Sequence, residues 1–364
     1  MLWIVAVAVV IPALVSAVLT AIVRGWARRT GFVDSPGGHK GHDNPTPLGG
    51  GIAITWTLCG TVLAGSLGVW LIHHGGWTDR LPGLLRVHAS GISGKLLDVL
   101  AIVAGAVVLH VTGLIDDRRP LGPMPKLVVQ VLVAVGLVWG FDIRAVEFLG
   151  PAPSIVLTVL WLVLIINAFN FLDNTDGLSA GVAAIVAAIL AAAAMMSGQV
   201  FVPAIAWVLV GSLLGFLLFN FSPASIFMGD AGSMVVGYFL GVLTVLTTYY
   251  DPDKALSPYG VLAPGVVLAV PLYDVASVVW VRIRAGDSPF HGDRRHFSHR
   301  LIRRGMSPRA AVLTIYLATA ATSLAAMLLP HADWPTACMI LVQTLCVVLM
   351  IAVLEREPNR RATR

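Results

Sequence analysis

The sequence predicts an all-α, polytopic integral membrane protein. Of its 364 residues, 57% are hydrophobic and 12% are charged, whereas a soluble domain carries about 25% charged residues. Its apolar runs approach the roughly 20 residues that a helical span needs, and they lack the alternation of membrane β-strands. These observations exclude a soluble globular fold and predict about 11 transmembrane helices.

Each apolar run is expected to form one span. The runs occupy residues 2–23, 49–73, 95–114, 125–140, 154–170, 178–197, 201–221, 232–250, 260–282, 309–330 and 334–354. The first lacks a basic amino-terminal region and a small-x-small cleavage site, so we expect a retained span and not a signal peptide. No soluble domain or linker separates the runs. We therefore expect residues 1–364 to form a single transmembrane domain.

The basic residues divide unequally between the two sets of loops that alternation places on opposite sides. Nineteen of the 24 Lys and Arg residues fall in one set, at 24–40, 118–126, 282–309 and 356–364, and five fall in the other. The positive-inside rule places the first set in the cytoplasm, the amino terminus outside and the carboxyl terminus inside. The net charge of +5 is thus an orientation signal and does not indicate nucleic-acid binding.

The most informative stretch, 167–177, reads Asn-Ala-Phe-Asn-Phe-Leu-Asp-Asn-Thr-Asp-Gly between the fifth and sixth runs. Ionisable groups at membrane depth are costly and usually line a cavity or a site. Polar residues recur every three positions, at 167, 170, 173 and 176. On a helix, successive members of this set would touch, but all four could not share one face. We expect a helix end, a tight turn and a new helix after Gly177. An ordinary polar loop is the alternative, but the stretch contains no Lys or Arg.

Two motifs precede this stretch on the same predicted side. The loop 34–51 contains His39 and His42 and ends in three glycines, which permit close approach to a neighbour or a ligand. The motif 116–126 begins with Asp116 and Asp117. Adjacent residues on a helix point about 100° apart, so we expect unequal roles for the two acids. A helix-end acid pair balanced by the following arginines is the alternative.

Two further motifs follow. Residues 227–233 place Asp230 between glycines at the start of a span, where free helix amides suit a phosphate or a metal–phosphate group; an N-cap aspartate is the alternative. In 288–301, His296 and His299 would face the same way on a helix. Zinc would need a third ligand from His291, and we consider it the weaker interpretation. Asp274, inside the ninth run, is either a site residue or an internally paired structural acid.

Carboxylates, a lysine, histidines and arginines thus converge on one membrane face. Oxygen-rich acidic sites suit Mg²⁺, which commonly bridges substrate phosphates. Phosphoryl transfer depends on such neutralisation together with positioning. The residues alone therefore predict a metal-dependent phosphotransferase at the membrane surface, without naming its substrates.

The motifs resemble the polyprenyl-phosphate N-acetylhexosamine-1-phosphate transferase family, in its WecA/TagO-like branch, which is related to MraY. The resemblance covers nearly the whole chain and rests on 45–50, 116–126, 167–178, 227–233 and 293–299. It implies transfer of a sugar-1-phosphate, with GlcNAc-1-phosphate as the first choice, from a UDP-N-acetylhexosamine to undecaprenyl phosphate or a similar polyprenyl phosphate, releasing UMP. The setting would be cell-envelope polysaccharide synthesis at the inner (plasma) membrane.

The resemblance also implies Mg²⁺ as cofactor, with Mn²⁺ able to substitute, and an active site in the cytoplasmic loops. The lipid bilayer is a partner, nucleic acid is not, and a homodimer is left open. By position, the metal ligands would be Asp230 and Asn170. The catalytic residues would be Asp116, Asp117, Lys126 and Asp173. The substrate-binding residues would be His42, Asn167, Asp176, Gly177, Asp293, His296, His299 and Arg300.

Two departures from the family pattern bear on donor contacts. His39 stands where the family often has Arg, and Ser298 interrupts the usual pair of histidines. One rival function is an MraY-like phospho-MurNAc-pentapeptide transferase. A rival of another class is a membrane transporter with a buried acidic site. A transporter would favour charges near midspan, whereas here most charges lie at one face.

Overall fold

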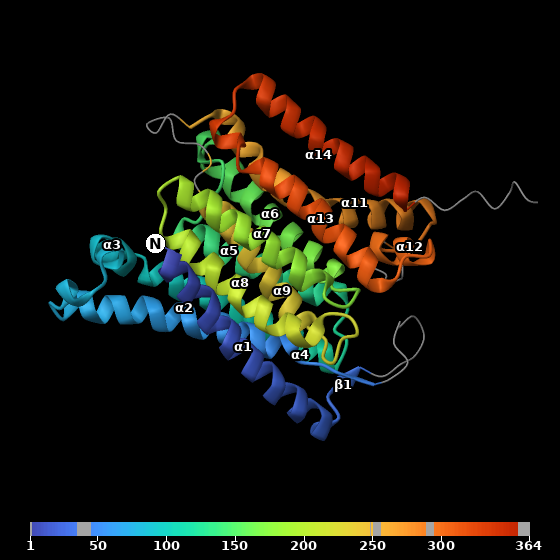
Figure 1. Cartoon of the computed structure of the whole chain (residues 1–364), viewed down its shortest axis with the longest axis horizontal. Helices are drawn as coiled ribbons and strands as arrows, with labels where there is room; N and C mark the ends of the chain where they lie inside the picture. The colour runs from blue at the N-terminus through green and yellow to red at the C-terminus, as the bar shows by residue number, and fades with distance from the viewer. Residues whose placement is uncertain (1, 35–44, 248, 250–255, 289–294, 356–364) are drawn as a thin grey trace, which may run out of the picture.

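The computed structural model describes residues 2–34, 45–247, 249, 256–288 and 295–355, and these form a helical bundle (Figure 1). Its α-helices are α1 Leu2–Thr30, α2 Gly50–His74, α3 Gly83–Gly94, α4 Leu96–Arg118, α5 Pro123–Phe141, α6 Pro151–Leu172, α7 Leu178–Met196, α8 Phe201–Asn220, α9 Asp230–Leu246, α10 Ala263–Val267, α11 Ala269–Arg284, α12 Phe297–Arg303, α13 Pro308–Ala326 and α14 Trp334–Leu354. Short 3₁₀ helices lie at Thr78–Arg80, Glu147–Leu149, Pro258–Leu262 and Leu329–His331.

The predicted all-α membrane fold is confirmed. Within the described residues, nine helices are long and apolar enough to cross a membrane, and a bent pair raises the number to at most ten. The run predicted at 232–250 forms α9, which has 17 residues and is shorter than a standard span. The sequence did not predict the two-residue strands β1 Val33–Asp34 and β2 Thr46–Pro47, which pair antiparallel.

The ninth predicted span, 260–282, is not straight. Pro258–Val267 and Ala269–Arg284 meet at an angle of 61°. Pro271 has no N–H to donate to the carbonyl of Val267 four residues earlier, so the helix cannot continue regularly through this point. The hydroxyl of Ser323 on α13 donates to that carbonyl instead, at 3.1 Å. The bend is therefore stabilised by a neighbouring helix.

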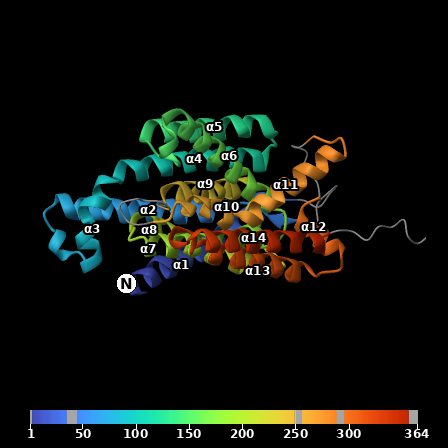
Figure 2. The same ribbon diagram turned by 90° about the horizontal axis from the view of Figure 1, so that it is seen from above.

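Helix α9 occupies the interior of the bundle. In Figure 2, α4, α5 and α6 lie on one side of it and α13 and α14 on the other. It packs against α2, α4, α6 and α7, and every residue from Ala231 to Thr244 is buried. A helix that is apolar all round belongs in a core. Its polar first residue, Asp230, therefore lies at the end of a rigidly packed element.

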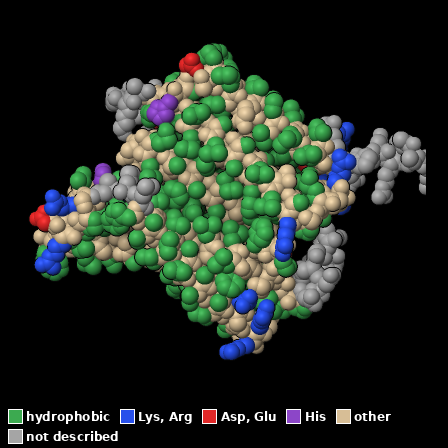
Figure 3. Space-filling model, viewed as in Figure 1, with side chains coloured by type: hydrophobic (Ala, Val, Ile, Leu, Met, Phe, Trp, Pro, Cys, Tyr) green, Lys and Arg blue, Asp and Glu red, His purple; other side chains and the backbone are tan. Residues whose placement is uncertain are grey.

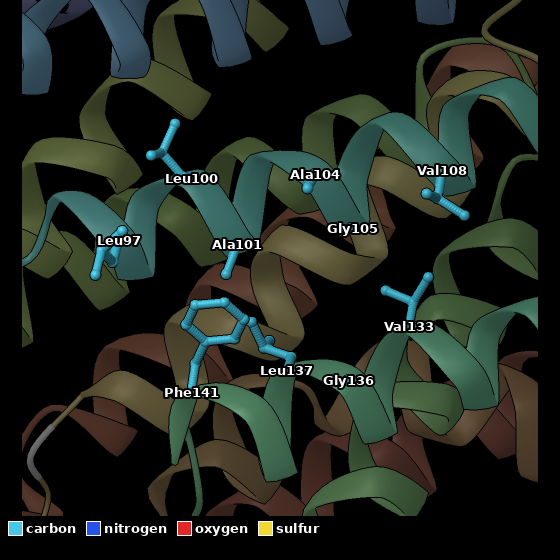
Figure 4. A pocket seen from close by; sticks show the side chains of 10 residues that line it. All are labelled: Leu97, Leu100, Ala101, Ala104, Gly105, Val108, Val133, Gly136, Leu137 and Phe141. Carbon is cyan, nitrogen blue, oxygen red and sulfur yellow. The ribbon is translucent and has the colours of Figure 1, made fainter.

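The outer surface fits a lipid environment. Hydrophobic side chains cover the flank of the bundle, and Lys and Arg side chains lie towards its ends (Figure 3). An apolar groove of about 440 Å³ lies on this surface between α4 and α5. Figure 4 shows Val133, Leu137 and Phe141 of α5 beside the small residues Ala101 and Ala104 of α4. None of the predicted site residues lines this groove.

Candidate active site

The site is centred on Asp230, the first residue of α9. The carboxylate Oδ2 accepts a hydrogen bond from Lys126 Nζ on α5 at 2.7 Å. The other oxygen, Oδ1, accepts from Asn170 Nδ2 near the end of α6 at 2.9 Å. Asn170 Nδ2 also lies 3.0 Å from Ser233 Oγ, one turn along α9. Side chains from α5 and α6, 104 and 60 residues before Asp230 in the sequence, thus meet at one carboxylate.

Lys126 joins a second carboxylate to this centre. Its Nζ lies 3.1 Å from Asp116 Oδ2 in the last turn of α4. The other oxygen of Asp116 accepts the backbone N–H of Leu121 at 2.8 Å, which closes the short loop between α4 and α5. The Lys126 side chain is 20% exposed. The cation therefore lies between two carboxylates and still reaches the surface.

Asp117 points to different partners from Asp116, as the rotation between neighbours predicts. Its carboxylate accepts the backbone N–H groups of Asp230 at 2.8 Å and of Ala231 at 3.2 Å. These are free amides at a helix amino terminus, where an acceptor and a negative charge both stabilise the helix. Asp117 thus holds the start of α9, and through it the position of Asp230.

The glycine-rich motif after β2 pairs directly with the motif that precedes α9. Phe227 N–H donates to the Pro47 carbonyl at 2.8 Å, and Gly50 N–H donates back to the Phe227 carbonyl at 2.9 Å. Gly51 N–H then donates to the Met228 carbonyl at 2.9 Å. The close approach expected of these glycines is confirmed, and the neighbour is the segment that carries Asp230.

Glycines also allow α2 and α4 to reach the first turn of α9. A Cβ on Gly51 would lie 2.5 Å from Gly232 Cα, and a Cβ on Gly113 of α4 would lie 2.5 Å from the Asp230 carbonyl carbon. Ordinary contacts of a Cβ begin at 3.4 Å. These two helices can therefore pack here only where the side chain is a hydrogen atom.

The central turn between α6 and α7 has the predicted form. Helix α6 ends at Leu172, and Gly177, with φ of 75°, precedes α7. Asp176 Oδ2 accepts the Ala224 N–H at 2.9 Å. Gly177 N–H donates to Asn220 Oδ1 at 3.0 Å, and the Tyr316 hydroxyl donates to the Gly177 carbonyl. Asp176 and Gly177 thus fasten this turn to α8, α13 and the loop before α9.

Asp173, in the same turn, carries a strongly perturbed carboxyl group. Burial raises its pKa to about 8, and repulsion from Asp230 and Asp117 adds to the shift, while a hydrogen bond from the Gly229 backbone opposes it. Asp173 therefore holds its proton at neutral pH while no cation is near. A bound cation would favour the ionised form instead.

A second cluster surrounds α12. His296 Nδ1 lies 2.8 Å from Asp274 Oδ2 of α11. Arg300 is held by Ser277 Oγ at 2.7 Å and by Glu355 Oε2 at 2.9 Å. The predicted donor-binding residue His299 lies in the same short helix. The predicted residues His296, His299 and Arg300 thus lie together beside the middle of α11, where Asp274 and Ser277 hold His296 and Arg300.

The residues around Asp230 and the cluster around α12 meet at the central turn between α6 and α7. The ring of Phe171 lies edge-on to His296 at 5.9 Å between centroids, and Ser298 Oγ donates to Asn174 Oδ1 at 2.6 Å. Ser298, which departs from the family pattern, thus contributes to docking α12 on this turn. Asn167 lies almost one turn before Asn170, and its amide donates to Gln130 Oε1 at 2.6 Å and to the Val163 carbonyl at 2.8 Å.

Several predictions cannot be placed. His39, His42, His291 and Asp293 lie outside the described residues. Four further residues at the site were not predicted from the sequence: Gln130, Ser233, Asn220 and Glu355. Gln130 gave a signal, being a polar residue inside an apolar run. Glu355 gave none, because its partners lie far away in the sequence.

The chemistry of the donors fits a magnesium ion. Lys126 contacts the carboxylates of Asp116 and Asp230. Asp117 and Asp173 add two more carboxyl groups to the site, and repulsion from Asp230 and Asp117 contributes to the raised pKa of Asp173. Within the described part of the chain, no three His, Cys, Asp or Glu side chains form a ready metal cage. Mg²⁺ does not need one, since it commonly binds through one or two carboxylates, substrate phosphates and water.

Comparison with known proteins assigns the chain to a family. The family model "Glycosyl transferase family 4" matches residues 99–248. The chain is 33% identical over 334 residues to a Bacillus subtilis protein named "Probable undecaprenyl-phosphate N-acetylglucosaminyl 1-phosphate transferase", covering 90% of this chain and 85% of the relative. The chain belongs to the polyprenyl-phosphate N-acetylhexosamine-1-phosphate transferase family.

Other relatives of this transferase agree. "Decaprenyl-phosphate N-acetylglucosaminephosphotransferase" of Mycobacterium tuberculosis is 36% identical, with 84% of this chain and 77% of the relative covered. "Undecaprenyl-phosphate alpha-N-acetylglucosaminyl 1-phosphate transferase" of Escherichia coli is 28% identical, with 82% and 76% covered. The segment matched by the family model contains Asp116, Lys126 and Asp230. Family membership confirms the resemblance and the expectation of a membrane-bound transferase.

Proposed function

We propose that the protein transfers GlcNAc-1-phosphate from UDP-GlcNAc to undecaprenyl phosphate, giving undecaprenyl-pyrophosphoryl-GlcNAc and UMP. The observation that carries the proposal is the placement of Lys126 between Asp116 and Asp230, at the end of α9 where three helices meet. The names of the three relatives support GlcNAc as the sugar. They include undecaprenyl and decaprenyl carriers, and we select the undecaprenyl chain as the first to test.

The reaction joins two phosphate groups that repel each other. An oxygen of the lipid phosphate forms a bond to the phosphorus that bears the sugar, and the bond from that phosphorus to the UMP oxygen breaks. Such transfers depend on positioning and on neutralisation of negative charge. Lys126 supplies a fixed positive charge at the site, and its two carboxylate partners orient its ammonium group.

Mg²⁺, with Mn²⁺ able to substitute, is the proposed cofactor, and Asp230 and Asn170 are the residues proposed to hold it. When bound, the ion supplies charge neutralisation at substrate phosphates. Asp117 contributes by fixing the amino end of α9, so its proposed role is to hold Asp230 in place. This division of labour follows from the contacts of each carboxylate.

Asp116 is the residue proposed to act at the lipid phosphate. Lys126 holds one of its oxygens and the Leu121 amide holds the other, so its orientation is fixed. We prefer the role of a general base, which removes the last proton of the phosphate. Positioning of that phosphate is the alternative role, and the two differ in their dependence on pH.

The donor is proposed to bind across the central turn and α12. Asp173 and Asp176 would shape the pocket, and Asn167, Gly177, His296, His299 and Arg300 would bind or support the nucleotide-sugar, with His42 and Asp293 contributing from outside the described residues. The contact between Phe171 and His296 supports this arrangement, because it joins the cluster around α12 to the end of α6.

The site is proposed to face the cytoplasm from a single transmembrane domain, residues 1–364, in the plasma membrane. The excess of basic residues in the loops on the side of the site supports this orientation. Membership in a transferase family favours an enzyme over a transporter. The GlcNAc in the names of the relatives favours UDP-GlcNAc over an MraY-like donor.

The test uses purified full-length protein, Mg²⁺ and undecaprenyl phosphate with a panel of radiolabelled donors: UDP-GlcNAc, UDP-GalNAc and UDP-MurNAc-pentapeptide. We expect label to enter the lipid extract with UDP-GlcNAc and UMP to be released in equal amount. The Lys126→Met variant is the control for the site. Transfer from only the pentapeptide donor, or no transfer from any donor, would refute the proposal.

A further inference from the structure

Asp274 is a buried acid that the proposed mechanism does not use. It lies in α11 after the bend, beyond the segment matched by the family model, and its side chain is 0% exposed. A fully buried carboxylate is costly unless each oxygen has a partner. Its partners therefore show what the residue is for.

Both oxygens of Asp274 are used by the residues at the start of α12. Oδ2 lies 2.8 Å from His296 Nδ1, and Oδ1 accepts the Phe297 N–H at 3.2 Å. A carboxylate without a proton can only accept hydrogen bonds, so Nδ1 is the ring nitrogen that donates in this contact. With Nδ1 as the donor, the neutral form of the ring presents its second nitrogen, Nε2, as an acceptor.

The ring of His296 is also fixed from a second direction. Phe171 meets it edge-on, with planes at 82°, and the Arg282 guanidinium lies 5.4 Å from the centre of the Phe171 ring. Arg282 is itself 2% exposed. The imidazole is thus held between a hydrogen-bonded carboxylate and an aromatic ring, so neither its tautomer nor its plane is free.

We propose that Asp274 is a positioning residue that fixes the tautomer and orientation of His296, so that Nε2 accepts a hydrogen bond from a hydroxyl or N–H group of the nucleotide-sugar donor. This inference rests on the proposed function. Asp274 does not touch the donor in this account, and it acts only through His296. The same carboxylate fixes the Phe297 amide, so the ring and the start of α12 are placed together.

The variant Asp274→Asn separates the two tasks of the carboxylate. Its single amide oxygen can still accept the Phe297 N–H, but its NH₂ group then faces His296 Nδ1. The ring must take the other tautomer, in which Nε2–H donates. Loss of the partner that orients a metal-ligating histidine typically costs about 10- to 100-fold in metal affinity or activity, and Asp274 would hold His296 in the same way. We expect that loss in kcat/KM for the donor, with the KM for the acceptor unchanged.

A double-mutant cycle with His296→Ala gives the decisive measurement. If Asp274 acts only through His296, Asp274→Asn should cost nothing further in the His296→Ala background. A structural effect would cost the same in both backgrounds, within about two-fold. Ser323→Ala is the matched structural control, because it disturbs the bend of α11 without touching α12. Its effect should be additive.

A second pair of variants tests the same idea if Asp274→Asn proves unstable. In His296→Gln the amide group reaches the position of Nε2, whereas in His296→Asn it reaches that of Nδ1. Higher activity of the Gln variant is expected. Additive losses in the cycle, wild-type activity of Asp274→Asn, or higher activity of His296→Asn would overturn the inference. Failure of the proposed function is distinct, since the wild type would then transfer no sugar-1-phosphate.

Discussion

Gly51 offers a direct test of how the site is assembled, because it touches no proposed substrate. It is the second residue of α2, and its N–H donates to the Met228 carbonyl just before α9. The methyl group of Gly51→Ala would lie 2.5 Å from Gly232 Cα and 2.7 Å from the Ala231 carbonyl carbon. Both are backbone atoms of the turn that carries Asp230, so no side chain can rotate to make room.

The size of the effect follows from these distances. Ordinary contact begins at 3.4 Å, so α2 and α9 must separate by at least 0.9 Å. Overpacking of this kind costs about 1–3 kcal/mol of stability. A misplacement near 1 Å can lower catalysis by about 100-fold. We expect Gly51→Ala to lose roughly that factor in kcat while the protein remains folded at moderate temperature.

The assay measures UMP release with UDP-GlcNAc and undecaprenyl phosphate, together with thermal unfolding in detergent. Gly60→Ala is the matched control, because it lies in the same helix and its added methyl group meets nothing within 4 Å. It should be fully active and no less stable, since Ala is favoured over Gly in helices by about 1 kcal/mol. Activity of Gly51→Ala within about two-fold of the control would refute the reasoning.

Four further predictions concern charge and topology. Lys126→Met should fold, since Lys126 is partly exposed, but should lose at least about 100-fold in kcat because two carboxylates lose their shared cation; near-normal turnover would contradict this. The loss of kcat in Asp116→Asn should shrink as the pH rises from about 6 to about 9. The second pKa of the lipid phosphate is near 6, so a base is least needed at high pH. Asp117→Asn should show no such rescue, and a pH-independent loss for Asp116→Asn would leave positioning as its role. In metal-free buffer, the stability of the folded protein should fall as the pH rises towards about 8. Below that pH the carboxyl group of Asp173 keeps its proton in the folded protein, whereas in the unfolded chain it has lost it. The unfolding temperature of Asp173→Asn should decline less with pH, and an equal decline in both proteins would argue against the raised pKa. A cysteine at position 295 should resist impermeant reagents in intact cells, and its labelling would reverse the proposed orientation.

The sequence by itself determined the fold class and the approximate positions of the helices around the site. Hydropathy decides whether a segment enters a membrane, and backbone hydrogen bonds within helices are local, so the spans and the turn at Gly177 could be predicted. The unequal orientation of Asp116 and Asp117 also followed from helix geometry. Periodicity further identified the polar motifs, although it could not say which of their residues would meet.

Only the tertiary structure decided the partners. Asp117 bonds to amides 113 and 114 residues away, and nothing local distinguishes such a capping acid from a catalytic one. The glycines after β2 meet the start of α9 because these two segments of the chain approach within backbone contact. Asp274 could be either a site residue or a structural acid until its carboxylate was found at His296. Side-chain partners over such separations depend on how the helices pack, and the pattern of a single segment does not contain that information.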